Sequence, residues 1–198
     1  MATLPTHLAL IKLASIRADA RLAAQLKQTL ALAGGLPADT VRVFSAIETA
    51  QTYVYLPTSN VPDDTTLAVW LDAAKQVSNA NGTIALLTRH YDLPGASAGA
   101  QAPWHYIVET DVVPDAQSDL NAWYDTEHMP GLAAVPGTVR AQRYVNPTGT
   151  PRYHACYDLH TQETFGSPPW LAVRATDWSA RVRPNFRNTI RTMFTVVG

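Results

Sequence analysis

The sequence predicts an α+β fold in which two ferredoxin-like β-α-β-β-α-β repeats pack as an α+β barrel within one chain. One observation is an internal repeat, since His7 recurs at His105 and the triplet Thr-Val-Arg at 40–42 recurs at 138–140, both 98 residues later. Another is that both halves show the same order of expected strands and helices. Because a ferredoxin-like sheet covers only one face with helices, two copies can bury their bare faces together.

The first half of the chain carries the pattern of one β-α-β-β-α-β unit. Residues 7–14 form a continuous apolar run typical of a buried strand. Leu22, Leu26 and Leu30 then mark one face of a helix that should end at the glycine pair 34–35. Apolar residues recur at helical spacing once more between 67 and 74, and the expected strands cover residues 7–14, 40–47, 51–56 and 83–87.

The second half repeats this order, with strands expected over residues 104–111, 138–145, 152–159 and 189–197. We expect its first helix to run from Asp115 to about Glu127, because Pro130 disfavours helical geometry in the residue before it. The second helix should begin at Ser167, whose hydroxyl can cap it, followed by two prolines in the first turn.

Small residues and turn formers separate the two halves. The segment 94–103 reads Pro-Gly-Ala-Ser-Ala-Gly-Ala-Gln-Ala-Pro, without an apolar period, and is typical of an exposed connector. The sequence therefore predicts a first repeat over residues 1–93, a linker over 94–103 and a second repeat over 104–198.

The composition excludes several classes of function. A formal net charge of −1 and the absence of a long basic run argue against nucleic acid as a partner. Cys156 is the only cysteine, which excludes an internal disulfide and leaves the cytoplasm as the expected location. The N-terminal residues lack the pattern of a signal peptide, and no apolar run approaches the roughly 20 residues of a membrane-spanning helix, so no membrane partner is expected.

The two halves differ at one position of a helix face. If the residues between the repeated anchors align without gaps, Leu30 of the first half corresponds to His128 of the second. An imidazole that titrates near pH 6.5 can accept or donate a proton at neutral pH, which makes His128 the candidate general acid or base. The structural alternative is a buried neutral histidine bonded to the backbone at a helix end.

The residues around His128 form a recognisable motif. They read Trp-Tyr-Asp-Thr-Glu-His-Met-Pro over 123–130, followed by Val-Pro-Gly over 135–137 and Arg-Tyr at 143–144. This pattern resembles the EthD-like group, named for ethyl tert-butyl ether degradation, within the dimeric α+β barrel superfamily. The resemblance implies the barrel fold. Superfamily members include cofactor-free monooxygenases, lactone isomerases, polyketide cyclases, haem-handling enzymes and proteins of no known activity.

Several aromatic side chains are candidates for binding a substrate beside His128. Tyr124 shares its helix face at a spacing of four, and Tyr144 is a second candidate hydrogen-bond partner. Trp123 flanks the same face of this first helix. Period-two spacing on strands adds Tyr106, Tyr153 and Tyr157, and fourfold spacing on the second helix adds Trp170 and Trp178, with Arg174 between them. Ordinary core packing is the alternative for each of these aromatic residues.

Nearby charged residues have simpler explanations. Glu127 precedes His128, but adjacent helical residues point about 100° apart, which favours a surface position. Arg140 and Arg143 alternate along one strand, so at most one can face a given pocket, and pairing with acids is the favoured role. The acids and histidines of the strands lie too far apart along each strand to converge on one ion, so no metal site is expected.

These observations lead to a hypothesis and two alternatives. The leading hypothesis is a cofactor-free enzyme of the isomerase, dehydratase/cyclase or monooxygenase type that acts on a small apolar or aromatic metabolite through His128. The first alternative is an accessory protein that binds such a molecule without changing it, and the second is haem binding. Motifs for dinucleotides, P-loops and serine hydrolases are absent, and the chain is expected to act as a monomer or homodimer.

Overall fold

The computed structural model describes residues 6–198, which divide into two compact units. The first unit comprises the described residues up to Arg89 together with Met193–Gly198. Its elements are strands β1 (His7–Ala14), β2 (Arg42–Ala46), β3 (Gln51–Thr58) and the first part of β4 (Gly82–Pro94), with helices α1 (Ala20–Gly34) and α2 (Asp64–Ser78) and a 3-10 turn at Ala38–Thr40. The expected elements of the first repeat are all present.

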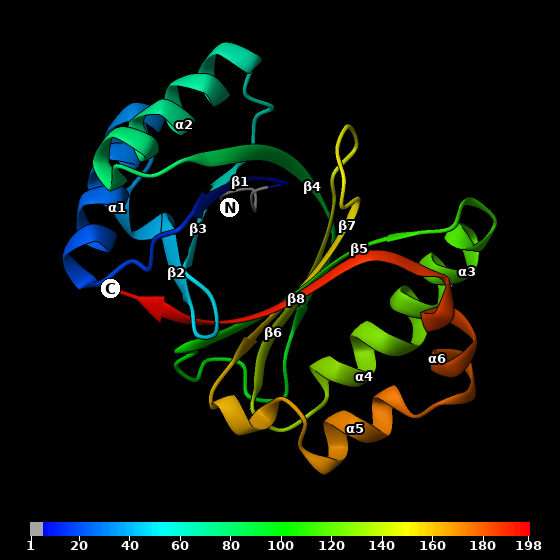
Figure 1. The fold of residues 1–198 in the computed structure, drawn as a ribbon. Helices are drawn as coiled ribbons and strands as arrows, with labels where there is room; N and C mark the ends of the chain where they lie inside the picture. The colour runs from blue at the N-terminus through cyan, green and yellow to red at the C-terminus, as the bar shows by residue number, and fades with distance from the viewer. Residues whose placement is uncertain (1–5) are drawn as a thin grey trace. The chain divides into compact units, whose positions relative to one another are not determined.

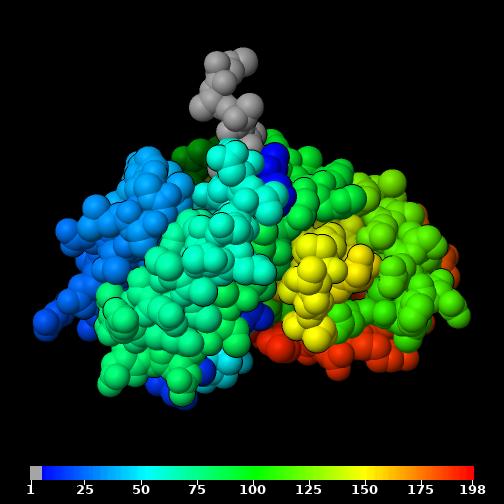
Figure 2. Space-filling model, turned by 90° about the horizontal axis from the view of Figure 1, so that it is seen from above, coloured from blue at the N-terminus to red at the C-terminus, as the bar shows by residue number. Residues whose placement is uncertain are grey.

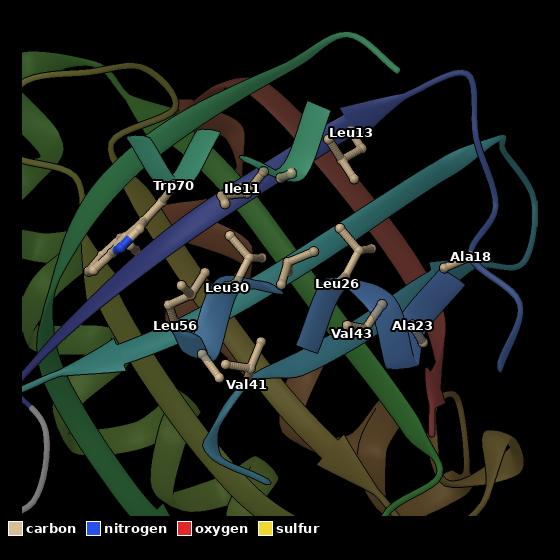
Figure 3. Close-up of a cluster of buried hydrophobic side chains, with 14 residues drawn as sticks. Ile11, Leu13, Ala18, Ala23, Leu26, Leu30, Val41, Val43, Leu56 and Trp70 are labelled. Atoms are coloured by element: carbon tan, nitrogen blue, oxygen red, sulfur yellow. The ribbon is translucent and has the colours of Figure 1, made fainter. Parts of the chain in front are cut away.

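Caps and apolar spacing explain the two helices of this unit. Asp19 accepts a hydrogen bond from the Leu22 amide at the start of α1, and Gly35 ends the helix in the left-handed region with φ of 60°. The inner faces of both helices pack on β1, β2 and β3 (Figure 1). Figure 3 shows this core, in which Leu26 and Leu30 of α1 meet Ile11 and Leu56 of the sheet.

The second unit comprises residues His90–Thr192. Its strands are β5 (Trp104–Val112), β6 (Thr138–Val145), β7 (Tyr153–Leu159) and most of β8 (Phe186–Val197). Its helices are α3 (Gln117–Trp123), α4 (Met129–Ala133), α5 (Pro168–Arg174) and α6 (Asp177–Val182), with a π-helical turn at Tyr124–His128 and 3-10 turns at Pro114–Ala116, Gln162–Thr164 and Arg183–Asn185. The turn between β6 and β7 lies at the molecular surface, in yellow in Figure 2.

Hydrogen bonds link the strands in the order β1-β3-β2-β8-β5-β7-β6-β4, the order of a closed barrel. The first repeat therefore contributes its strands in the order β4-β1-β3-β2, and the second in the order β8-β5-β7-β6. In both, the fourth strand lies beside the first and the third lies between the first and second, as in a ferredoxin-like sheet. The predicted fold class, two ferredoxin-like repeats forming an α+β barrel, is confirmed.

The compact units do not coincide with the repeats along the sequence. The last strand of each repeat is long, and its final residues group with the other unit: β4 from His90 onward with the second, and β8 from Met193 onward with the first. Val197 thus lies opposite Val43 of β2 in the first unit. The segment 94–103 is largely exposed, as expected, but it is bound to the second unit, because Gly95 and Ser97 donate backbone hydrogen bonds to Val139 and Thr138.

The expected helix end near residues 127–128 is wrong. The helical path continues from α3 through the π turn into α4 and ends at Ala133. In the π turn the amide of Met129 bonds to the carbonyl of Tyr124, five residues back. This wider turn relieves the clash that a proline ring makes with the carbonyl four residues before it, so Pro130 is accommodated at the start of α4.

Candidate functional site

A small cavity lies between the helices and the sheet of the second unit. Its volume is about 30 Å³, enough for about two water molecules. The residues around it come from β5, β7, β8, α3, the π turn, α4, α5 and the 3-10 turn after α6: Tyr106, Val108, Trp123, Tyr124, His128, Leu132, Tyr157, Trp170, Arg174, Arg183, Phe186 and Arg191. His128 is therefore placed at a cavity.

The π turn holds His128 inside this aromatic wall. Its imidazole stacks on the indole of Trp123 with ring centroids 4.1 Å apart, and it meets Tyr124 edge-on at 5.4 Å. The side chain is 8% exposed, and its Nδ1 atom has no hydrogen-bond partner within residues 6–198. Because buried polar atoms are nearly always hydrogen-bonded, this nitrogen is available to a bound molecule.

The surroundings of His128 keep it neutral. Burial, and to a lesser extent the positive charges of Arg174 and Arg183, lower the pKa of the imidazole to about 3. A neutral imidazole has one nitrogen that accepts and one that donates a hydrogen bond. His128 can therefore accept a proton in this cavity only if something offsets the cost of the resulting positive charge.

Three phenols complete the polar part of the cavity. Burial raises the pKa values of Tyr106 and Tyr157, and it raises that of Tyr124 to about 12. All three hydroxyls are therefore protonated at neutral pH. Tyr157 donates to the sulfur of Met129 at 3.3 Å, and its ring lies 5.2 Å from that of Trp170.

Glu127 does not contact His128 but positions the tryptophan beneath it. Its carboxylate accepts hydrogen bonds from Trp123 Nε1 at 3.1 Å and from the Thr176 hydroxyl at 2.6 Å. The sequence-based expectation of a surface glutamate missed this role, since Glu127 is half-buried between α3 and the start of α6.

Arg143 fastens the π turn to strand β6. Its guanidinium is completely buried, donates to Asn121 at 2.6 Å and to Asp125 at 3.2 Å, and lies over the rings of Tyr124 and Tyr153. Arg140 on the other face forms two hydrogen bonds with Asp92. Both arginines thus pair with nearby acids, which is the role that the sequence analysis favoured for them.

The structure brings six of the nine candidate site residues to the cavity: His128, Trp123, Tyr124, Tyr106, Tyr157 and Trp170. It places Tyr144, Tyr153 and Trp178 elsewhere. Tyr144 lies opposite His154 on β7 and alternates with Arg143, so it occupies the other face of the sheet and does not reach His128. Tyr153 lies under Arg143, and Trp178 donates to Asp119 at the edge of α3.

Sequence reasoning missed two of the three arginines at the cavity. Arg174 had been considered, but Arg183 and Arg191 had not. A signal for them was present, because residues 178–198 contain arginines at 181, 183, 187 and 191 and no acidic residue. An unbalanced run of this kind indicates a local excess of positive charge.

Gly131 permits the close approach of α4 and α5, the helix that carries Trp170 and Arg174. A Cβ atom at Gly131 would lie 2.8 Å from Val173 Cγ1. We expect Gly131→Ala to lower the free energy of unfolding by about 1–3 kcal/mol through overpacking, offset in part by up to about 1 kcal/mol of helix propensity. Urea unfolding checks this, and Val173→Ala added to Gly131→Ala should recover stability. No recovery in the double variant would argue against this contact.

The opposite face of the second unit's sheet carries two buried histidine–carboxylate contacts. His105 Nδ1 lies 2.7 Å from Asp158, and His154 Nε2 lies 3.2 Å from Glu109. Within residues 6–198, no group of three or more histidine, cysteine or acidic side chains is arranged to hold a metal ion. Each contact gives one ring nitrogen and one carboxylate a partner in an almost fully buried place, while Nδ1 of His154 has no partner within residues 6–198.

A larger cavity, about 260 Å³, lies in the first unit beside the ends of β1, β3 and β4. It is lined by Lys12, Leu13, Ala14, Gln51, Tyr53, Asn81, Gly82 and Thr83. Lys12 lies over the ring of Tyr53, and none of the buried polar atoms that lack partners belongs to this lining. We therefore take the smaller cavity at His128, which has two such atoms, as the candidate functional site.

Comparison with known proteins identifies the fold. No family model and no curated protein matches the chain. A Fusobacterium nucleatum protein provisionally named a monooxygenase has a TM-score of 0.65 and 10% identity, over 100% of this chain and 94% of that one. A mutant chlorite dismutase from Candidatus Nitrospira defluvii has a TM-score of 0.61 and 10% identity, over 98% of this chain and 92% of that one. An anthrone oxidase-like protein has a TM-score of 0.57 and 15% identity, again over 98% of this chain and 92% of that one.

At these identities the likeness establishes the fold alone. The chain has the ferredoxin-like α+β architecture of these solved structures. No helix within residues 6–198 is long and apolar enough to cross a membrane.

Haem, the second alternative raised by the sequence analysis, does not fit the cavity at His128. The cavity holds about 30 Å³, whereas sites for drug-sized molecules occupy roughly 300–1,000 Å³. A cavity of this size has no room for a haem.

Proposed function

We propose that this protein is a cofactor-free enzyme of the EthD-like group that removes a proton from a small, largely aromatic metabolite. His128 is the base. The single observation that carries the proposal is the buried Nδ1 of His128, which has no hydrogen-bond partner within residues 6–198 at a cavity walled by aromatic rings. The likeness to an anthrone oxidase-like protein supports an aromatic substrate by analogy.

The chemistry follows from the charges at the cavity. A neutral imidazole accepts the proton from an acidic C–H or phenolic O–H group, and the electron pair stays on the substrate as an enolate or phenolate. That anion would lie near Arg174 and Arg183, whose charges disfavour a positive imidazole while the cavity is empty. The new negative charge offsets both arginines and stabilises the imidazolium. This step is common to isomerisation, dehydration and reaction with dioxygen.

Entry of a metabolite requires the lining to move. A volume of about 30 Å³ is smaller than an aromatic ring needs, since a cavity of about 150 Å³ is known to hold benzene. Arg174 and Arg183 are half-buried and Arg191 is exposed, and these long side chains are the members of the lining best able to change rotamer. We propose that they open the cavity.

A second candidate function is binding without turnover. The low pKa of His128, about 3, favours it, because such an imidazole is a weak base in the unliganded protein. In that case His128 serves as a neutral hydrogen-bonding group for a metabolite. The two functions separate when a bound molecule is recovered unchanged or altered.

Hydrogen–deuterium exchange of an acidic substrate C–H group tests the proposed base directly. We expect the wild-type protein to accelerate exchange in D₂O at the acidic carbon of anthrone or phenylpyruvate, measured by NMR. His128→Gln should lower that acceleration by about 10²–10⁴-fold, the usual contribution of a general base. The control is His160→Gln at an exposed histidine. Equal acceleration by wild type and His128→Gln would remove the role proposed for His128.

A further inference from the structure

Three arginines of the second unit converge on the His128 cavity from separate elements. Arg174 ends α5, Arg183 begins the 3-10 turn that follows α6, and Arg191 lies on β8. None of the three forms an ion pair or a side-chain hydrogen bond with any other residue of 6–198. In the same unit Arg140, by contrast, is paired with Asp92.

The three charges act on one another without a nearby counter-charge. Burial lowers the pKa of Arg183, and the charges of Arg174 and Arg191 lower it further. Among residues 6–198, no aspartate or glutamate lines the cavity. Glu127, which lies behind Trp123, is occupied by its bonds to Trp123 and Thr176. The cavity thus gathers like charges that repel each other until an anion enters.

Neutral groups beside the arginines are also without partners. Trp170 Nε1 and His128 Nδ1 both belong to residues that line the cavity, and both atoms are buried with no hydrogen-bond partner within residues 6–198. An indole N–H can only donate. An anionic occupant that accepts hydrogen bonds would satisfy the indole N–H together with the guanidinium groups, and Nδ1 of His128 keeps its lone pair to accept a proton.

The rest of the wall is aromatic, from Tyr106, Trp123, Tyr157 and Phe186. We infer that the substrate of this site is an aryl carboxylate, whose carboxylate is held by Arg174, Arg183 and Arg191 while its ring packs on these aromatic residues. This inference rests on the proposed function, because it names the substrate class of the same cavity. Arginine forms bidentate hydrogen bonds with carboxylates, which gives such a site its specificity over neutral molecules.

Direct binding of benzoate tests the inference without requiring turnover. Titration calorimetry should show that wild type binds benzoate at least tenfold more tightly than benzyl alcohol, its neutral analogue, and more tightly than acetate, which lacks the ring. Arg183→Gln and Arg174→Gln should each weaken benzoate binding at least tenfold, the usual loss for a charged hydrogen bond. Arg181→Gln is the matched control, because Arg181 pairs with Asp119 away from the cavity.

The unfolding temperature of the unliganded variants gives a second readout. Because the cavity arginines repel each other, Arg183→Gln should unfold at the same temperature as wild type or a higher one, so loss of binding is not loss of fold. Equal binding of benzoate and benzyl alcohol, equal binding of benzoate and acetate, or a tight benzoate complex in both arginine variants would each overturn the inference.

The outcome is separable from that of the proposed function. Benzoate binding that depends on Arg183, combined with no His128-dependent exchange, keeps this inference and removes the catalytic role. Exchange that depends on His128, combined with benzoate binding unaffected by Arg183→Gln, keeps the catalytic role and removes this inference.

Discussion

Replacing His128 with leucine should make the protein more resistant to acid than the wild type. Below about pH 6.5 the unfolded chain takes up a proton on His128, while the folded protein keeps the ring neutral until about pH 3. The unfolded state therefore binds more protons across this window, and the wild type loses stability as the pH falls. The loss is about 1.4 kcal/mol per pH unit, or about 3 kcal/mol by pH 4.

Urea unfolding of wild type and His128→Leu at pH 7, 6, 5 and 4 measures this effect. Leucine is the residue that the first repeat carries at the equivalent position, Leu30, where it is completely buried. His160→Leu, which changes an exposed histidine, is the control for loss of an imidazole. A stability difference between wild type and His128→Leu that stays constant from pH 7 to 4 would contradict the account.

The position of His128 was predictable because two independent patterns agreed. The 98-residue offset aligned it with Leu30, and fourfold spacing put it on the face shared by Leu120 and Tyr124, all of which are buried. The π turn was not predictable, because no simple spacing distinguishes π from α geometry, and Pro130 alone suggested a helix end. The face of the sheet that Tyr144 occupies was not predictable either, because it depends on the pairing of β6 with β7.

The arginines show a different limit of sequence reasoning. Arg183 and Arg191 reach the cavity from a turn and from the last strand, so their convergence depends on how those elements pack on α3 and α5. Local periodicity carries no such information. The run of arginines without acids near the C-terminus was a usable signal, but it indicates only an excess of charge and not the place where that charge meets.

Replacing Arg143 with methionine should cost the protein a large part of its stability. Arg143 is completely buried and holds Asn121 and Asp125, on α3 and the π turn, against β6. Methionine preserves much of the apolar stem but leaves these oxygens without their donor. Because Asp125 is 30% exposed and also contacts His90, the expected cost is that of leaving part-buried acceptors without a donor, about 1–3 kcal/mol. Chemical denaturation measures the loss.

The control for Arg143 is the neighbouring arginine of the same strand. Arg140 pairs with Asp92, but its side chain is 41% exposed, so Arg140→Met should cost about 1 kcal/mol or less. Similar losses for the two variants would mean that Arg143 does not fasten the π turn as described.

The pH titration of the His128 ring by NMR tests the central claim most directly. With labelled histidine, and with the His128→Gln spectrum used for assignment, the His128 signals should stay unchanged from pH 8 to pH 5, because the ring is neutral with a pKa of about 3. A midpoint near pH 6.5, the value of a solvated imidazole, would place the ring in water and contradict the buried site.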